Sequence, residues 1–332
     1  MPGQAQHRLT VIVLAGVTIL LAALTLHARR QTSDMIVLKL AHGLDSTHPV
    51  HISMEYMAKR VFEKSGGGMR IDIFPSEQLG SERECTEQVQ LGSLDMTKSS
   101  TTALEPFIPE MGVFTLPYMF RDSEHYWEVL NGEIGDEILA AGLPVGLHGL
   151  CYFDAGSRSF YATRPIESPA DFRGKKIRVQ QSPTAMAMID ALGGAPTPIP
   201  FGELYTALQQ GVVDGAENNA PSFLTSRHYE VAKYFALNEH AYVPDALIMS
   251  EVVWRNLPPD AQRHLAEAAD EAAVFQRDLW AKMSAEAIET LKEAGVTVTH
   301  PDKQPFVDAV RPMLSAPKHP AVERLVQKIL AQ

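Results

Sequence analysis

Two spacings of apolar residues alternate along the first third of the chain, and each predicts one kind of element. Residues 36–41 are mostly apolar and predict a strand, and residues 69–73 alternate apolar with charged side chains, as a second strand does. Between them, apolar residues recur every three or four positions from Met54 to Phe62, which predicts a helix with one buried face. The glycines at 66–68 are expected to end this helix.

A second helix and a third strand follow in the same region. Ser81 and Glu84 have the spacing of a capping box, and Gly92 is the expected stop of the helix that they begin. Residues 94–97 then predict a strand. Because strands alternate with helices here, we expect an α/β lobe built on a largely parallel sheet.

The same alternation repeats after residue 150 and predicts a second α/β lobe. Extended segments are expected at 150–153, 159–162 and 176–180. Helices are expected at 183–192 and 203–210, each followed by glycine.

Residues 212–221 read Val-Val-Asp-Gly-Ala-Glu-Asn-Asn-Ala-Pro and are the most informative stretch of the chain. We expect a short apolar strand, an Asp-Gly turn, and then Asn218 and Asn219 just ahead of a helix opened by Pro221. Side-chain amides and unpaired helix N–H groups would then point to one place, which favours a site for a small anion.

Apolar residues also form a long stripe near the end of the chain. The stripe runs without proline from residue 260 to 294, which at 1.5 Å per residue predicts a helix on the order of 50 Å long. That length exceeds one lobe, so we expect the helix to brace both. A coiled-coil segment for dimerisation is the alternative, although the stripe spans few heptads.

The first 30 residues have the character of an export signal. Residues 9–26 are uncharged and mostly apolar, and Arg8 precedes them. Residues 1–30 are therefore expected to be a cleaved signal peptide or a retained N-terminal anchor, since the apolar run is close to the length that spans a bilayer. Both possibilities place the folded part outside the cytoplasm, in the periplasm.

The net charge of the chain narrows the class of partner. The 332 residues carry a formal net charge of -11, which argues against nucleic acid or an anionic membrane as partner. A few buried arginines can still attract a small anion.

The sequence contains two cysteines, Cys85 and Cys151. Export permits a disulfide between them as readily as two buried thiols.

Enzyme and metal signatures are missing from the sequence. It contains no Gly-x-Ser-x-Gly, no Walker loop, no Gly-x-Gly-x-x-Gly after a strand and no His-Glu-x-x-His. His48 and His51 are helical neighbours, but no third ligand of suitable spacing accompanies them, so we expect no metal site. We expect no cofactor and nominate no catalytic residue.

Several polar residues are candidates for ligand contact, each with a plainer alternative. Alternation on the 176–180 strand separates Arg178 from Ile177 and Val179, and a guanidinium there can hold a carboxylate with two parallel hydrogen bonds. A solvated strand face is the alternative, and Arg158 carries no signal of its own. Asn218 and Asn219 can also be turn and cap residues, and Glu82 can simply complement a helix dipole.

Spaced motifs in these same segments resemble the DctP-type substrate-binding proteins of TRAP transporters, the tripartite ion-driven uptake systems of bacteria. The resemblance runs from about residue 38 to 305. Its landmarks are Gln78-Leu79-Gly80, residues 87–95, Leu116-Pro117-Tyr118, residues 174–179, Glu203-Leu204-Tyr205 and residues 214–218.

This resemblance implies a two-lobed periplasmic fold with hinge strands that closes over one ligand, and a membrane permease as partner. The implied lobes are 35–155 plus 244–280, and 156–243 plus 281–332. Arg178 matches the family arginine that clamps a ligand carboxylate, Arg158 a second arginine that assists it, and Asn218 a polar residue on the same group.

Other short segments resemble the family branch that binds hexuronates and related sugar acids. They are 48–51, 81–84, 156–161, 214–221 and 239–240. His48 lies in one of them, and Glu82, Asn219 and Glu239 could accept hydrogen bonds from sugar hydroxyls. Lys98 could instead bind the far end of a C4-dicarboxylate. A C4-dicarboxylate and a diketo sugar acid therefore remain alternative ligands. A periplasmic lyase or hydrolase using Glu82 or His48 as a base, and a ligand sensor, are rival hypotheses.

Overall fold

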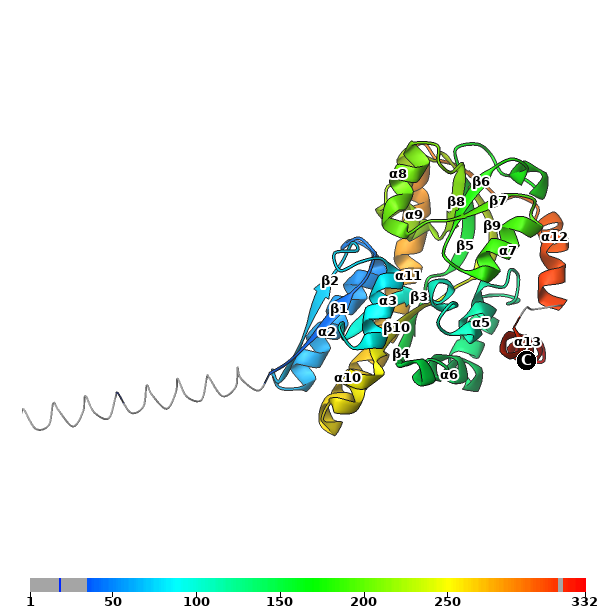
Figure 1. Cartoon of the computed structure of the whole chain (residues 1–332). Coiled ribbons are helices and arrows are strands. Elements are labelled where there is room, and N and C mark those ends of the chain that lie inside the picture. Colours follow the sequence, from blue (N-terminus) through cyan, green and yellow to red (C-terminus); the bar gives the residue numbers. More distant parts are fainter. Residues whose placement is uncertain (1–17, 19–34, 316–318) are drawn as a thin grey trace, which may run out of the picture.

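The computed structural model describes residue 18, residues 35–315 and residues 319–332 of the chain (Figure 1). The predicted signal peptide or anchor at 1–30 lies, apart from residue 18, outside this part. Within the described residues, no helix combines the length and apolar character that crossing a membrane requires.

Two separate sheets form the centres of two lobes, as the sequence predicts (Figure 1). In the first sheet the strand order is β2-β1-β3-β10-β4, with β1 parallel to β2 and β3, and β10 antiparallel to β3 and β4. Its strands are β1 (Ile36–Ala41), β2 (Met69–Phe74), β3 (Met96–Ser100), β4 (Leu147–Phe153) and β10 (Asp245–Ser250).

The strand predicted at 94–97 begins two residues later, as β3. Gly92 ends the preceding helix in the left-handed conformation. Asp95 then forms two hydrogen bonds to neighbouring segments: its carbonyl accepts the Ser250 N–H, and its carboxylate accepts the Lys39 N–H. Regular pairing with neighbouring strands therefore starts at Met96.

The second sheet has the order β11-β9-β5-β8-β6-β7. Strand β6 is parallel to β7 and β8, whereas β5 is antiparallel to β8 and β9. Its strands are β5 (Ser157–Ala162), β6 (Lys176–Val179), β7 (Ala195–Pro198), β8 (Gly215–Asn218), β9 (Tyr234–Tyr242) and β11 (Thr297–Thr299). The chain crosses between the sheets at 154–156, between β4 and β5, and at 243–244, between β9 and β10.

The predicted Asp-Gly turn at 214–215 is wrong, because Gly215 opens strand β8. Asp214 instead docks against β6, where its N–H donates to the Lys176 carbonyl and its carboxylate accepts the Lys176 N–H. A Cβ at Gly215 would lie 2.7 Å from the carbonyl oxygen of Tyr161 on the neighbouring strand. Glycine at this position is therefore needed for close strand contact, not for a turn.

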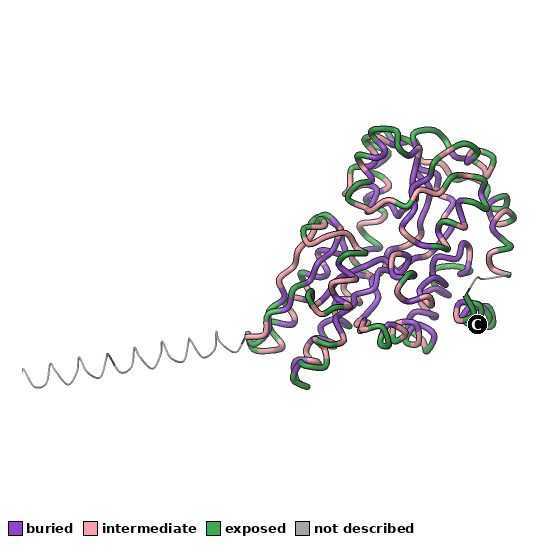
Figure 2. Tube along the Cα trace, in the orientation of Figure 1, coloured by how far each residue is buried: buried purple, intermediate pink, exposed green. Residues whose placement is uncertain are grey.

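Helices cover both sheets and bury the central strands inside each lobe, whereas the edge strands β7 and β11 keep exposed residues (Figure 2). Beside the first sheet lie α2 (Pro49–Lys64), α3 (Glu82–Leu91), α4 (Thr101–Leu104), the 3-10 helix η1 (Pro109–Thr115), α5 (Ser123–Leu130), α6 (Glu133–Ala140) and α10 (Glu251–Asn256). With the second sheet lie α7 (Pro183–Ala191), α8 (Leu204–Gln209), α9 (Ala220–Thr225) and α12 (Gln304–Ser315). The capping box of Ser81 and Glu84 is present.

The last helix, α13 (Pro320–Leu330), lies in the stretch 281–332 that the sequence assigned to the second lobe. It packs instead against η1 and α6, beside the first sheet. Its buried side chains, Val322, Leu325, Val326 and Ile329, belong to the apolar core of that lobe.

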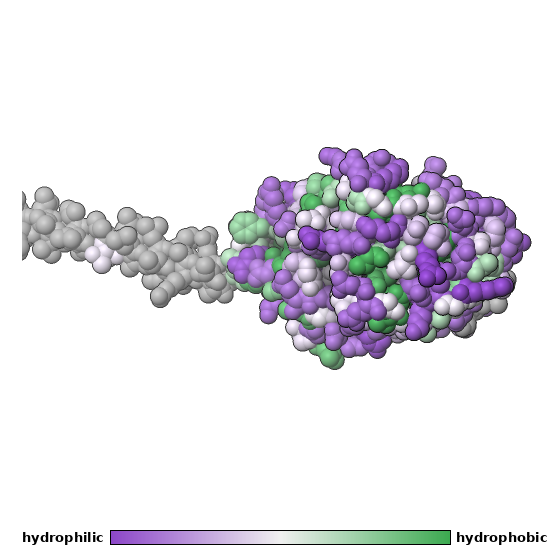
Figure 3. All heavy atoms as spheres, turned by 90° about the horizontal axis from the view of Figure 1, so that it is seen from above, coloured by the Kyte–Doolittle hydropathy of each residue, from purple (hydrophilic) through white to green (hydrophobic). Residues whose placement is uncertain are grey.

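The outer surface of the protein is mostly hydrophilic in the view of Figure 3, with small apolar areas near its centre.

The predicted long helix is α11 (Pro259–Glu293), and it braces both lobes. Its N-terminal half buries Leu265 and Ala272 in the core of the first lobe with α2. Its C-terminal end buries Ala287 and Leu291 in the core of the second lobe.

Two residues of α11 hold the crossing between β4 and β5. The Gln276 side chain is fully buried; it accepts the Asp154 N–H at 2.7 Å and donates to the Asp154 carbonyl at 2.8 Å. One turn later Trp280 lies against Gly156, where a Cβ would come within 2.9 Å of the indole nitrogen. Gly156 also has a φ of +56°, so both space and backbone conformation require glycine. The lobes are thus joined at a point fixed to α11.

We expect Gln276→Leu to lower the free energy of unfolding by about 2 to 4 kcal/mol, because it leaves a buried N–H and a buried carbonyl unpaired. Urea unfolding followed by circular dichroism measures the loss. Gln262→Leu on the same helix is the control, since Gln262 is partly exposed and donates a single bond to the Trp254 carbonyl. A loss for Gln276→Leu no larger than that of the control would contradict the assigned clamp.

Candidate ligand-binding site

Two adjoining chambers lie between the lobes, and we name them by position. Together with the solvent at their openings, the inner chamber spans about 370 Å³ and the outer chamber about 400 Å³. Glu82, Gln180 and Phe201 line both chambers, which makes them one continuous cleft. The inner chamber is otherwise lined by Gly43, Leu44, Lys98, Ser100, Ala155, Arg158, Asn218, Asn219, Ser222 and Asp245. The outer chamber adds Ser81, Arg83, Ala103, Arg178, Gln181, Ile199 and Pro200.

Arg178 is a buried cation that no carboxylate of residues 35–315 or 319–332 pairs with. It lies on β6, and its neighbours Ile177 and Val179 are buried in the core of the second lobe, as alternation predicts. Its Nε donates to the Ile199 carbonyl at 2.8 Å, but its buried Nη1 has no hydrogen-bond partner within the described part of the chain. Only 2% of the residue is exposed, so the alternative of a solvated strand face is wrong.

The surroundings of Arg178 disfavour an unpaired charge. Burial lowers the pKa of Arg178 below its ordinary value. The ring of Phe201 lies 5.8 Å from the guanidinium carbon, which adds a weak cation–π contact. An anion that enters the cleft would meet a positive charge with open hydrogen-bonding capacity.

Arg158, in contrast, is fully paired within the protein. Its Nε and Nη2 donate to the two carboxylate oxygens of Glu217, and its Nη1 donates to Asn218 Oδ1 at 2.9 Å. Burial would raise the pKa of Glu217, but Arg158 and His240 lower it to about 2. The charge of Arg158 is therefore balanced by Glu217 even though the residue lines the inner chamber.

The two amides have different roles. Asn218 Oδ1 accepts from Arg158 and from the Asn219 N–H, so the oxygen is used and the amide nitrogen is the group left for a ligand. Asn219 is the N-cap of α9 and accepts the Ser222 N–H, which is the cap role that the sequence left open. Both side chains line the inner chamber.

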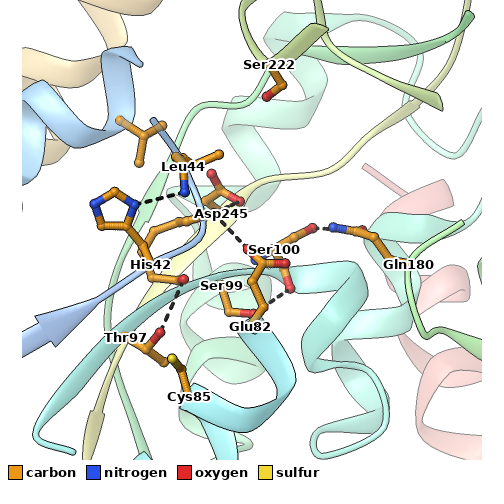
Figure 4. Close-up of polar contacts among 12 residues, drawn as sticks. His42, Leu44, Glu82, Cys85, Thr97, Ser99, Ser100, Gln180, Ser222 and Asp245 are labelled. Carbon is orange, nitrogen blue, oxygen red and sulfur yellow. Dashed lines mark hydrogen bonds and ion pairs between the residues drawn. The ribbon is translucent and has the colours of Figure 1, made fainter. Parts of the chain in front are cut away.

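Lys98 is paired with two carboxylates at the other wall of the inner chamber. Its Nζ lies 2.9 Å from Glu82 Oε1 and 3.3 Å from Asp245 Oδ1. Burial would lower the pKa of Lys98, but the two acids together raise it. Glu82 also accepts the Ser100 N–H at 3.2 Å and projects from the first turn of α3 toward Ser100 (Figure 4).

The remaining two candidates do not line the chambers. His48 is the N-cap of α2, where its Nδ1 accepts the Val50 N–H, so its Nε2 carries the hydrogen and donates to Ser222 Oγ at 3.1 Å. It thus reaches the ligand region through Ser222. Glu239 lies in a different hollow and is ion-paired with Lys303. The backbone at Glu239 is irregular: its φ is +47°, and the pairing register of β5 and β9 shifts there. Glu239 lies outside the cleft.

Several lining residues were missed at the sequence level. Gln180 shares the strand face of Arg178, and this two-residue spacing was a usable signal. Asp245 and Ser100 meet Lys98 and Gln180 only through the folded topology, for which the sequence offers no local pattern.

Direct hydrogen bonds join the lobes across the cleft. Ser100 Oγ donates to Gln180 Oε1 at 3.2 Å (Figure 4), and the Gly202 N–H donates to Glu77 Oε1 at 3.0 Å. At another point, Ser182 Oγ donates to Glu105 Oε2. The two lobes are therefore in direct contact around the chambers.

No group of three or more potential metal ligands occurs among the described residues. Cys85 and Cys151 are both buried free thiols, so the structure contains the thiol alternative and not a disulfide between them. Each lies in an apolar core of the first lobe. Burial raises the pKa of both thiols, which makes them poor nucleophiles.

Comparisons with known proteins agree with this geometry. A β-D-galacturonate complex of a TRAP periplasmic solute-binding protein from Xanthobacter autotrophicus Py2 is 40% identical, with a TM-score of 0.86 over 89% of this chain and 99% of that one. A glucuronate complex of such a protein from Anaerococcus prevotii is 36% identical, with a TM-score of 0.84 over 89% and 98% of the chains. The 2,3-diketo-L-gulonate-binding periplasmic protein of Escherichia coli is 32% identical over 84% of this chain and 86% of its own length.

The family model for bacterial extracellular solute-binding proteins of family 7 matches residues 40–318, most of the chain. Apart from the first residues of β1, the match covers both sheets, the residues that line the cleft, and α11. The chain therefore belongs to this family, DctP, whose members are the solute-binding proteins of TRAP transporters.

Proposed function

We propose that this TRAP solute-binding protein captures a sugar acid with a single carboxylate, a hexuronate such as galacturonate or glucuronate, and delivers it to its membrane permease. The unpaired guanidinium of Arg178 is the observation that carries the proposal. The hexuronates bound to its structural relatives support it. Arg158 and Asn218 are proposed to assist at the same carboxylate.

The balance of charges in the cleft favours a ligand with one acid group. Arg158 is paired with Glu217, and Lys98 is paired with Glu82 and Asp245. Arg83 is half-exposed and paired with Glu87 at the rim. Among the described residues that line the chambers, this leaves Arg178 as the one cation without an acidic partner. A second carboxylate on a C4-dicarboxylate would meet Glu82 and Asp245, and like charges repel there.

The remaining polar groups suit a polyol. Glu82 and Asp245 can accept hydrogen bonds from hydroxyls, whereas the Asn218 amide nitrogen and the Ser222 hydroxyl can donate to them. Ser222 accepts from His48, which leaves the hydrogen of its own hydroxyl to donate to a ligand. This mixture of donors and acceptors supports a sugar acid and keeps a diketo sugar acid as the second candidate, which the E. coli relative favours.

Ligand capture is proposed to work by closure of the two lobes. Arg178 and Asn218 belong to the second lobe, and Glu82 and Lys98 to the first, so one ligand can contact both. A ligand stabilises the closed state only by the difference between its affinities for the closed and open states. The closed form then presents the solute to the permease. We further propose that residues 1–30 export the protein and are cleaved or retained as an anchor.

A thermal-shift screen with uronates, aldonates, diketo sugar acids and C4-dicarboxylates tests the proposed function, because a ligand raises stability by RT ln(1 + [L]/Kd). We expect the hexuronates to give the largest shifts. NMR of the incubated ligand should show it unchanged, since a solute carrier does not convert its cargo. A largest shift from a C4-dicarboxylate, or conversion of the sugar acid, would contradict the proposal.

Arg178→Ala should weaken hexuronate binding by about two to three and a half orders of magnitude, because it removes a desolvated charge worth about 3 to 5 kcal/mol. Arg178→Lys should recover only part of the affinity, since lysine lacks the planar fork. Titration calorimetry measures both. Arg173→Ala, at an exposed arginine near the same strand, serves as the control and should bind like the parent. Binding by Arg178→Ala within threefold of the parent would rule out the assignment.

Glu82→Gln should narrow the preference for a hexuronate over succinate by about tenfold, because it removes one negative charge facing the far end of the ligand and leaves Lys98 less fully neutralised. The ratio of the two dissociation constants, measured by calorimetry, is the readout. Glu128→Gln, an exposed residue on α5, is the matched control. An unchanged ratio in Glu82→Gln would show that the far end of the cleft does not select against a second carboxylate.

A further inference from the structure

A short segment after β1 forms one wall of the inner chamber. Gly43 and Leu44 line this chamber, whereas His42, which precedes them, does not. The wall is closely fitted, because a Cβ at Gly43 would lie 3.3 Å from the side chain of Glu77. Glu77 in turn makes the bond to Gly202 in the other lobe. Any shift of this wall would therefore change both the chamber and a contact between the lobes.

His42 holds that wall from behind. Its own main chain is fixed to the end of β2, since its N–H donates to the Phe74 carbonyl at 3.0 Å and its carbonyl accepts the Glu77 N–H at 3.1 Å. Its side chain is buried, and its Nδ1 accepts the Leu44 N–H at 3.1 Å (Figure 4). This bond to the residue two positions later has the pattern of an Asx turn, with imidazole in place of a short amide.

The hydrogen-bond partners determine where each imidazole carries its hydrogen. Because His42 Nδ1 accepts from Leu44, its Nε2 carries the hydrogen and donates to His51 Nδ1 at 2.9 Å. His51 must then carry its own hydrogen on Nε2, which lies 3.3 Å from Glu55 Oε1 on the surface of α2. A directed chain thus runs from the chamber wall through two buried histidines to an exposed carboxylate.

The chain requires a neutral His42, and its surroundings keep it neutral. Burial first, and then the charge of Lys98 with His51 and His48 nearby, lower the pKa of His42 to about 2. Protonation of Nδ1 would remove the acceptor for Leu44, and this does not happen at mildly acidic or neutral pH. His42 is therefore a permanent hydrogen-bond acceptor beside a buried cation.

We propose that His42 is a positioning residue for ligand binding, which fixes Gly43 and Leu44 at the chamber wall through its bond to the Leu44 N–H and is itself oriented by His51. The inference rests on the proposed function, because it assigns the residue to the same site. His42 itself does not touch the ligand.

Three variants separate positioning from stability. His42→Phe keeps a planar ring but removes the acceptor, whereas His42→Asn keeps an oxygen that can accept the N–H two positions later. His125→Phe is the matched control: His125 is also buried in the first lobe, and its Nδ1 accepts the Arg121 N–H at 3.3 Å, away from the chambers. Calorimetry with D-galacturonate and D-glucuronate gives the affinities, thermal unfolding gives Tm, and hydrogen exchange with mass spectrometry follows residues 42–48.

We expect His42→Phe to weaken binding by about tenfold, the size of effect that one neutral hydrogen bond supports, and to speed exchange in residues 42–48. His42→Asn should bind within threefold of the parent, and His125→Phe should bind like the parent at a comparable loss of Tm. Unchanged affinity in His42→Phe, or equal weakening in all three variants in step with Tm, would overturn the inference. A parent protein that binds neither sugar acid would instead overturn the proposed function, and this inference with it.

Discussion

The buried guanidinium of Arg178 is the constraint on which the cleft depends. A charge removed from water is expensive unless it is paired, and one buried terminal nitrogen of Arg178 has no hydrogen-bond partner among the residues that the structure describes. Every other charged side chain buried in the cleft has a counterion within the protein. Among the described residues, Arg178 is therefore the buried cation of the cleft whose charge is not balanced by an acid, and we propose that a ligand carboxylate balances it.

The other two buried cations of the cleft, Arg158 and Lys98, are paired with acids, so their charges are balanced within the protein before a ligand binds. Glu217 neutralises Arg158 and leaves it as a rigid donor beside Asn218. Glu82 and Asp245 neutralise Lys98 and turn the opposite wall into a group of acceptors. One end of the cleft is therefore suited to a carboxylate and the other to hydroxyls, which is the chemistry of a sugar acid.

Local patterns predicted the elements well, and topology decided what they did not predict. Alternation on β6 was enough to place Arg178 opposite Ile177 and Val179, and the apolar stripe predicted α11 as a brace. The pairing of Lys98 could not be predicted, since Asp245 comes from β10, a strand contributed after the chain has returned from the second lobe. The turn predicted at Gly215 was wrong for a similar reason. Glycine occurs both in turns and where strands come close, and only the contact with Tyr161 on the neighbouring strand distinguishes the two cases.

A crystal structure of the protein with bound D-galacturonate tests the central claim most directly. The account predicts both terminal nitrogens of Arg178 within hydrogen-bonding distance of the ligand carboxylate, with the Lys98 pairs to Glu82 and Asp245 intact. A carboxylate bound elsewhere in the cleft, with the Arg178 nitrogen still lacking a partner, would contradict it.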